Sequence, residues 1–276
     1  MRAGSDRDGA RCDAMRLRSR HRHRWSSGRG GDAVVEPGDL GPALARIVAE
    51  GGVAAPGRIC RACLAVLPVT RAAVTLMTSA DRQEPIWASD DVASHLDGVQ
   101  FSLGEGPCVE AFTEGRPVLV PDLAELTGHR WPMFADAARQ TTVQALFVLP
   151  LQAGALVIGV LDLYRDEPGM LRPDELAAAL RTADALLCAL LDLRGGQHGA
   201  MGDGGRGPDP NGWSSASPLN HTAVYQATGM VMAQLTLSPE AALSRLRATA
   251  FVQGRAIDEV AGDVVARRLR FDEEER

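Results

Sequence analysis

The most constraining feature of the chain is a series of three short amphipathic helix patterns near its C-terminus, between residues 221 and 269. In each pattern apolar residues recur at spacings of three and four, as on the buried face of a helix. They are Val224, Ala227, Val231 and Leu235, then Leu243, Leu246 and Ala250, then Ile257, Val260, Ala261 and Val264. Three such stripes in succession predict a small all-α domain of three helices.

The ends of the second of these helices are marked by residues with known capping preferences. Ser238 can accept hydrogen bonds from free helical amides, and Pro239 suits the first helical position. Glu240 complements the helix dipole, and Gly254 suits the residue that ends a helix. The second helix is therefore expected to begin at Ser238 and to end at Gly254.

At these residues the chain resembles the ANTAR domains, which are three-helix RNA-binding modules of bacterial transcription antitermination regulators. The motifs that carry the resemblance are QATG at 226–229, Leu246-Arg247, Arg255 and Val260-Ala261. The resemblance implies that RNA is bound by Gln226, Thr228, Gly229, Arg247 and Arg255. The family often has a lysine where this chain has Thr228. The family works as dimers, so the resemblance also implies a homodimer.

Two of these residue types have alternative explanations. Arg247 and Arg255 can contact phosphates or stack on bases of an RNA loop, or they can be surface arginines whose stems cover apolar side chains. Gly229 interrupts a run of good helix formers, at a cost of ~1 kcal/mol relative to alanine. Either RNA or a partner approaches the helix closely there, or another helix of the chain packs against it.

Residues 39–194 are expected to form one α+β domain in which helices flank an antiparallel sheet. The predicted helices are 40–49, 56–67, 105–114, 131–139 and 173–193. The predicted strands are 69–77, 85–88, 99–101, 117–120, 143–151 and 156–164. The alternation of short apolar strands with turn residues and helical patterns supports this fold class.

This segment resembles the GAF domains that precede ANTAR domains in actinobacterial regulators. The resemblance is carried by FSLGEGPC at 101–108, GRPV at 115–118 and IGVLDLY at 158–164. It implies a sensor domain with a small-molecule pocket on one side of the sheet. Trp87, Phe101 and Cys108 are candidates to line that pocket, although scarce aromatic residues are more often core. The asparagine–lysine signature of cyclic-nucleotide-binding GAF domains is absent, because all 29 basic residues are arginine.

The positions of the cysteines favour roles in core packing over metal binding or redox activity. Cys60 and Cys63 form a C-x-x-C pair inside an apolar helix pattern, with no second pair to complete a zinc site, and we expect them to fill the core. Cys108 lies at a helix start after the glycine-rich turn 104–106, where a lowered pKa and sensitivity to oxidants is an alternative. No pattern predicts a metal site, a cofactor or a catalytic constellation, so the chain is not expected to be an enzyme.

The remaining segments have polar, low-complexity compositions. Residues 1–38 hold the run RLRSRHRHR, and residues 1–32 contain 9 Arg against 4 Asp, so we expect a disordered extension. It is either a nucleic-acid-binding arm or the product of an upstream start codon, with Met15 and Val34 as other candidate starts. Residues 195–218 are expected to be a flexible linker and residues 272–276 an acidic tail.

The charge and location of the predicted domains narrow the function. Residues 219–271 contain 6 Arg against 4 acidic residues, a mildly basic balance of +2. No apolar run reaches the ~18 residues of a membrane span, and no signal peptide is evident, which favours a cytoplasmic protein. We therefore expect a signal-responsive RNA-binding antitermination regulator. The alternative is a ligand- or redox-sensing GAF protein that acts through a protein partner and binds no RNA.

Overall fold

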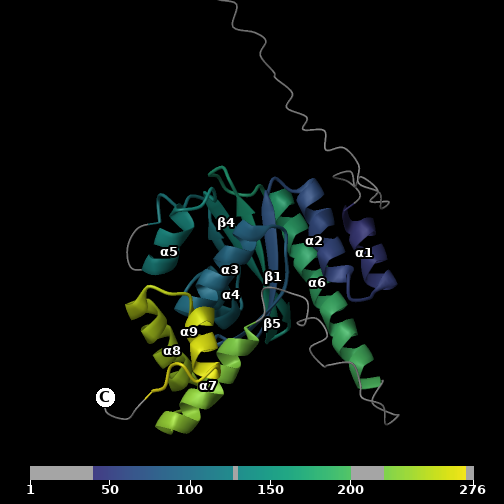
Figure 1. Cartoon of the computed structure of the whole chain (residues 1–276). Coiled ribbons are helices and arrows are strands. Elements are labelled where there is room, and N and C mark those ends of the chain that lie inside the picture. Colours follow the sequence, from purple (N-terminus) through teal and green to yellow (C-terminus); the bar gives the residue numbers. More distant parts are fainter. Residues whose placement is uncertain (1–39, 127–129, 200–220, 272–276) are drawn as a thin grey trace, which may run out of the picture. The chain divides into compact units, whose positions relative to one another are not determined.

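The computed structural model describes residues 40–126, 130–199 and 221–271, and these described residues belong to one compact unit (Figure 1). At its centre is a five-stranded antiparallel sheet of order β2-β1-β5-β4-β3. The strands are β1 (Arg71–Ser79), β2 (Arg82–Ala88), β3 (Val118–Val120), β4 (Ala145–Ala153) and β5 (Leu156–Arg165). The antiparallel α+β fold class predicted from the sequence is confirmed.

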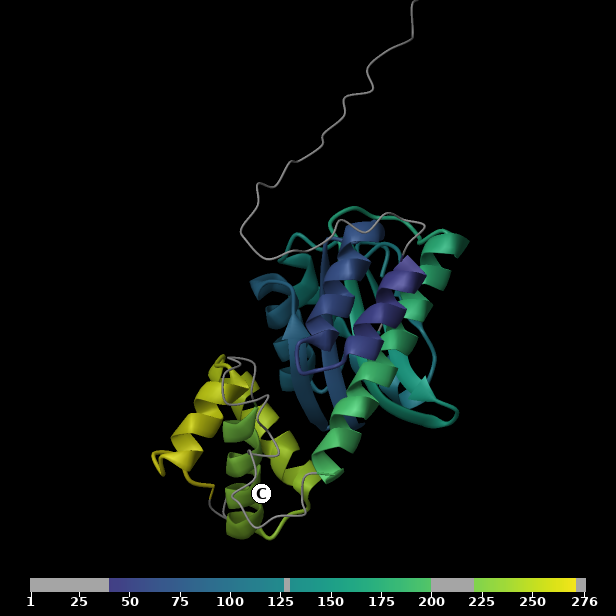
Figure 2. The ribbon, with the colours of Figure 1, turned by 90° about the vertical axis from the view of Figure 1, so that its right-hand side faces the viewer.

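The central strands are apolar on both faces because helices cover both. Seven consecutive residues of β4 and seven of β5 are buried, so these strands lack the alternation of a half-exposed sheet. One face is covered by α1 (Leu40–Glu50), α2 (Ala55–Val66) and α6 (Pro173–Gly199), which lie together in two views (Figures 1 and 2). The described part of α6 continues to Gly199, beyond the predicted domain end at residue 194.

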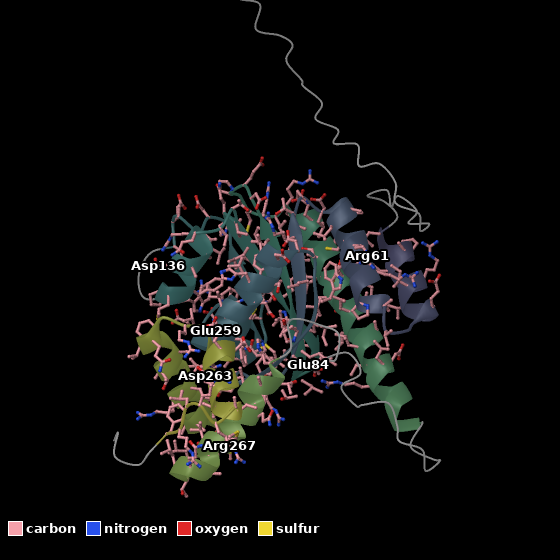
Figure 3. The ribbon with its side chains drawn as sticks, in the orientation of Figure 1. Arg61, Glu84, Asp136, Glu259, Asp263 and Arg267 are labelled. Carbon is pink, nitrogen blue, oxygen red and sulfur yellow. The ribbon has the colours of Figure 1, made fainter. Side chains whose placement is uncertain are left out.

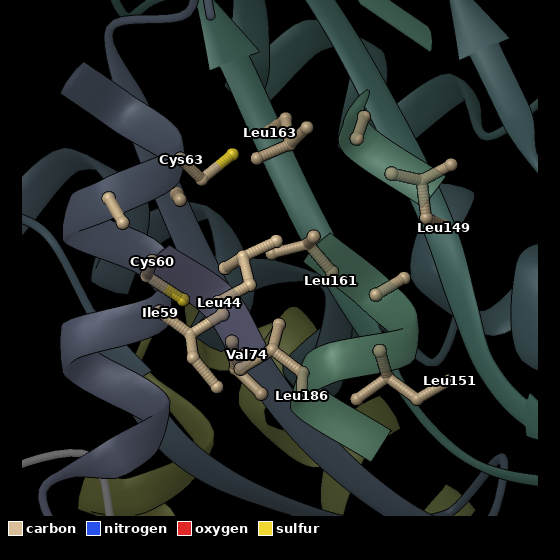
Figure 4. Close-up of a cluster of buried hydrophobic side chains, with 14 of the residues drawn as sticks. Leu44, Ile59, Cys60, Cys63, Val74, Leu149, Leu151, Leu161, Leu163 and Leu186 are labelled. Carbon is tan, nitrogen blue, oxygen red and sulfur yellow. The ribbon is translucent and has the colours of Figure 1, made fainter. Parts of the chain in front are cut away.

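Cys60 and Cys63 lie on the buried side of α2 and are fully inaccessible to solvent. The Cys63 sulfur points toward Leu163 of β5 and the Cys60 sulfur toward Leu44 of α1, and all four residues belong to one apolar cluster (Figure 4). Burial raises the pKa of the Cys63 thiol to about 12. The predicted packing position of this pair is therefore confirmed.

The opposite face of the sheet is covered by α3 (Asp91–Leu103), α4 (Pro107–Glu114) and α5 (Pro132–Arg139). The predicted strand at residues 99–101 is wrong, because these residues form the last turns of α3. The Asp90 side chain caps this helix by accepting a hydrogen bond from the amide of Ala93 at 2.9 Å. Gly104 ends it with a φ of 68°, a left-handed conformation that suits glycine.

The glycine-rich turn between α3 and α4 has a structural explanation. Gly106 has a φ of 140°, and a Cβ atom there would lie 2.5 Å from the Gln100 side-chain oxygen. Glu105, between the two glycines, accepts hydrogen bonds from the amides of Met133 and Phe134 at 2.8 and 3.1 Å. Its carboxylate thus caps the N-terminus of α5, where Trp131 provides no side-chain cap.

The C-terminal helices are α7 (Thr222–Leu235), α8 (Pro239–Gln253) and α9 (Ile257–Val265), as the periodicity predicts. The Ser238 hydroxyl accepts a hydrogen bond from the Ala241 amide, and Gly254 ends α8 with a φ of 60°. The apolar stripes form one core, which includes Leu246 and Val260. Phe101, a residue of α3, is fully buried in this same core.

Candidate RNA interface and buried polar cluster

Arg247, predicted to bind RNA, is held by residues of the sheet domain. Its Nε and Nη2 atoms donate hydrogen bonds to the carbonyl oxygen of Phe101 at 3.1 and 2.9 Å. Its Nη1 atom lies 2.6 Å from a carboxylate oxygen of Asp81, which follows β1. The guanidinium carbon lies 5.7 Å from the centroid of the Phe101 ring. The side chain is only 13% exposed, so this charge is engaged inside the protein.

Two aromatic contacts accompany this arginine. The Tyr225 hydroxyl of α7 donates to the carbonyl oxygen of Gln83 at 2.6 Å and accepts from the Gln83 amide at 2.8 Å. His221 stacks on the Phe101 ring with centroids 3.5 Å apart. Backbone groups of β2 and the last residues of α3 are therefore bound directly by α7 and α8.

The predicted motif on α7 is divided between its two sides. Gln226 and Gly229 are exposed, whereas Thr228 is buried and donates a hydrogen bond to the Val224 carbonyl at 2.7 Å. A Cβ atom at Gly229 would meet no described atom within 4 Å. Close packing by another described helix therefore does not explain this glycine.

Arg255 lies apart from the partners of Arg247. Its guanidinium contacts Asp263 at 2.7 Å and Glu259 at 3.6 Å, and both of these acidic residues are on α9 (Figure 3). Phe251, one turn earlier on α8, is 64% exposed. The structure thus places an exposed ring near the α8–α9 turn, a residue that the periodicity analysis did not identify. Its signal in the sequence is an apolar aromatic outside the stripe of α8.

The three residues predicted to line a ligand pocket are not brought together. Trp87 packs on the α2 side of the sheet, where its indole ring lies against Gly57. Phe101 belongs to the core of α7–α9, and Cys108 belongs to the opposite face of the sheet. The three side chains are separated because they lie on different faces of the sheet and of their helices. The aromatic content of the chain does not predict which face each residue takes.

Cys108 instead belongs to a buried polar cluster. Its Sγ atom lies 2.9 Å from Oδ1 of Asp162 on β5, and the Gln100 amide group donates to the same sulfur at 2.8 Å. The Gln100 side-chain oxygen accepts from the Cys108 backbone amide at 2.8 Å, which satisfies a free amide in the first turn of α4. Asp97, on α3, accepts from the Thr75 hydroxyl at 2.7 Å. Ligand atoms of Asp97, Cys108 and Asp162 all lie within 4.8 Å of one another.

Burial controls the ionisation of this cluster. Burial, followed by the neighbouring Asp97 carboxylate, raises the pKa of Asp162 to about 7. Burial also raises the pKa of the Cys108 thiol well above its usual value, with contributions from both carboxylates. The alternative of a lowered pKa at Cys108 is therefore contradicted. In this environment the thiol and the carboxyl groups favour their protonated forms.

Sequence reasoning missed this cluster for a physical reason. Asp97 and Gln100 lie three residues apart on α3, hence on one face, but the sequence pattern predicts only a short strand in this region. Asp162 is 54 residues from Cys108 along the chain, and only the folding of β5 against α4 brings them together. No short-range spacing signals such a cluster.

The fold and these contacts define a regulatory protein with a sensor domain and a helical module that packs against it. The chain belongs to the GAF domain family, which it matches over residues 57–217, and residues 219–265 match the ANTAR domain. The GAF and ANTAR resemblances found in the sequence are thereby confirmed. Both are regulatory domains. No curated protein matches the chain.

Solved structures with the GAF fold resemble the chain only distantly. A free methionine-R-sulfoxide reductase from Neisseria meningitidis is 17% identical, with a TM-score of 0.43, over 58% of this chain and 91% of its own. The GAF domain of a phosphoenolpyruvate-protein phosphotransferase from Coxiella burnetii is 14% identical, with a TM-score of 0.44, over 58% and 97%. None of the described helices is long and apolar enough to cross a membrane.

Proposed function

We propose that this protein is a cytoplasmic, signal-responsive RNA-binding regulator of transcription antitermination. The ANTAR domain binds hairpins of a nascent transcript and prevents a terminator from forming. The GAF domain receives a small ligand or a partner and performs no catalysis. The active form is a homodimer. The order of the two domains supports this function, since it places an RNA-binding module directly after a sensor.

The observation that carries the proposal is the set of contacts made by Arg247. This arginine is one of the two basic residues that the ANTAR resemblance assigns to RNA, and here its donors are used by Asp81 and by the Phe101 carbonyl. A guanidinium cannot give the same donors to a phosphate and to these oxygens at once. RNA and the GAF domain therefore compete for Arg247, and a signal that loosens the GAF contacts favours RNA.

The exposed surface of the ANTAR domain offers further contacts. Gln226 and Gly229 lie on the open side of α7, and Phe251 presents an exposed ring near Arg255. Single-stranded loop bases are commonly recognised by stacking on aromatic rings and by edge contacts to polar side chains. We assign Phe251 to base stacking, together with a phosphate contact from Arg255.

The competing function is regulation through a protein partner without RNA. The burial of Thr228, which replaces a lysine common in the family, and the mild charge of residues 219–271 favour it. RNA that co-purifies with the full chain from cells, identified by sequencing, separates the two functions. Enrichment of transcripts with paired hairpins supports the proposal, and the absence of enriched RNA supports the protein partner.

The competition for Arg247 is tested by gel-shift titration of an enriched hairpin pair. The Asp81→Ala variant removes an ion pair of ~0.5–1 kcal/mol, so it is expected to bind RNA roughly two- to fivefold more tightly. Because Arg247→Ala removes both the GAF contact and the RNA contact, it is best made in the Asp81→Ala background. There it is expected to cost ~1–3 kcal/mol of RNA binding.

Arg172→Ala serves as the matched control, because Arg172 is an exposed arginine of the GAF domain paired with Asp174. It is expected to leave RNA affinity unchanged, and circular dichroism verifies the fold of every variant. If Asp81→Ala weakens RNA binding, or if Arg247→Ala has no effect in the folded double variant, competition for Arg247 is excluded.

A further inference from the structure

The buried cluster of Asp97, Cys108 and Asp162 has an unusual charge balance. These residues are between 0% and 2% exposed, and the charged neighbour that acts most strongly on Asp162 is another carboxylate. Buried carboxylates are normally neutralised by a cation, a proton or a metal ion. Here His221 acts on Asp97, but burial still favours the protonated form of both carboxyl groups. A divalent cation can displace such protons because metal ligands bind in their deprotonated forms.

Two further oxygen atoms beside the cluster have no hydrogen-bond partner among the residues that the structure describes. They are Oδ2 of Asp162 and the hydroxyl of Tyr164, and both side chains are fully buried. Tyr164 lies two residues after Asp162 on β5, so the two side chains are on the same face of the sheet. Buried polar groups rarely lack a partner. Their lone pairs are therefore available to a ligand inside this cluster.

The distances within the cluster suit one ion. With metal–sulfur bonds of ~2.3 Å and metal–oxygen bonds of ~2.0–2.2 Å, sulfur and oxygen ligands at angles of ~90–110° lie ~3.0–3.7 Å apart. The Cys108 sulfur and the Asp162 oxygen are 2.9 Å apart, and all three ligand atoms lie within 4.8 Å of one another. Small side-chain rotations therefore bring the three ligands to bonding distance of a shared ion.

We propose that Asp97, Cys108 and Asp162 form a binding site for a divalent first-row transition-metal ion, with the Tyr164 hydroxyl and the second Asp162 oxygen as further donors. The thiolate excludes calcium and magnesium as preferred ions, since these take oxygen ligands. Mixed sulfur and oxygen donors suit zinc, cobalt or iron(II). On binding, the Cys108 proton and any carboxyl proton leave to solvent, and no oxidation is involved.

The site has a direct structural connection to the ANTAR domain. Gln100 binds both the sulfur and the backbone amide of Cys108, and the next residue, Phe101, is packed among α7–α9 and bound by Arg247. An ion that takes the Cys108 sulfur removes the hydrogen bond from Gln100. This connection rests on the proposed function, whereas the metal site itself does not.

The test is titration of the full chain, first stripped with a chelator, with Co²⁺ alone. Because the site is buried, the ion is added both to the folded protein and during refolding from denaturant. Binding of one equivalent with a sulfur-to-cobalt charge-transfer absorption band is expected. The band is expected to disappear in Cys108→Ser. In Asp162→Asn the apparent affinity for Co²⁺ is expected to fall at least tenfold.

Cys63→Ser is the matched control, because Cys63 is equally buried but lies on the other face of the sheet. Cys188→Ser controls for an exposed thiol. Both are expected to keep the band. Absence of the band in the wild-type chain under both conditions, or its persistence in Cys108→Ser, overturns the site. A wild-type chain without the band overturns the site even if a variant fails to fold, and the titration involves no RNA, so it is independent of the gel shifts.

Discussion

At the scale of single residues, Arg247 has an RNA-binding role predicted from its motif and a different set of contacts in the folded chain. Arg247 was identified by a motif and a position next to core Leu246. Its partners, Asp81 and the carbonyl oxygen of Phe101, lie 166 and 146 residues away along the chain. Local patterns predict that such an arginine is at the edge of a stripe, but only the tertiary structure determines which oxygen atoms it binds.

The ionisation of the two tyrosines of the chain reports how deeply their side chains are buried in the folded protein. Burial raises the pKa of Tyr225 to about 12, and burial together with the Asp162 and Cys108 charges raises that of Tyr164. We therefore expect no tyrosinate absorbance near pH 10 in the folded protein, and two phenols titrating at ~10 in denaturant. Because both pKa values are raised by folding, this contribution to the free energy of unfolding is complete below pH 10 and declines as the pH rises toward 12.

Tyr225→Phe is the control for this titration, and it should leave only Tyr164 to be detected. A phenol that ionises near pH 10 in the folded wild-type protein and is absent from Tyr225→Phe would show that Tyr225 is not buried against β2, because burial is what raises its pKa. Titration at successive stages of RNA binding then reports whether that hydroxyl is released.

At the scale of elements, the sequence predicts the helices that have capping residues and regularly spaced apolar residues. It does not predict α3, the helix that precedes the glycine-rich turn. The ends of α8 follow from Ser238 and Gly254, and β4 and β5 follow from their apolar runs. In contrast, α3 has polar residues on its buried side, including Asp97 and Gln100, so its stripe is weak. The residues that obscure the helix are the ones that build the buried polar cluster.

The open side of α7 yields a prediction about Gly229. Since a Cβ atom there meets no described atom within 4 Å, Gly229→Ala is expected to raise the free energy of unfolding by ~1 kcal/mol. The same methyl group should weaken RNA binding if RNA approaches the helix closely. Chemical denaturation and gel shifts measure the two effects.

Gly262→Ala on α9 is the matched control, because a Cβ atom at Gly262 also meets no described atom within 4 Å. It should stabilise the fold and leave RNA affinity unchanged. Equal RNA affinity in wild type and Gly229→Ala would contradict the prediction that RNA approaches this helix closely.

At the scale of the whole molecule, the predicted N-terminal extension and linker lie largely outside the described residues. The sequence prediction can still be tested, since residues 1–32 carry 9 Arg against 4 Asp. A chain that starts at Asp39 should keep its melting temperature and its preference among hairpins. Its RNA affinity should depend less steeply on salt, because fewer arginines displace counterions. Loss of hairpin preference or of folding in this shortened chain would contradict the prediction.

The burial of Phe101 limits how far the two domains can be treated as interchangeable parts. Its ring belongs by sequence to the sensor fold and by packing to the core of α7–α9. A GAF domain expressed alone leaves this ring uncovered, and an ANTAR domain expressed alone lacks one of its core side chains. A chimera that joins this ANTAR domain to another sensor therefore needs an aromatic residue at the corresponding helix end, with an acidic partner for Arg247. Recombination between such proteins is expected to preserve the end of α3 together with the helices that it contacts.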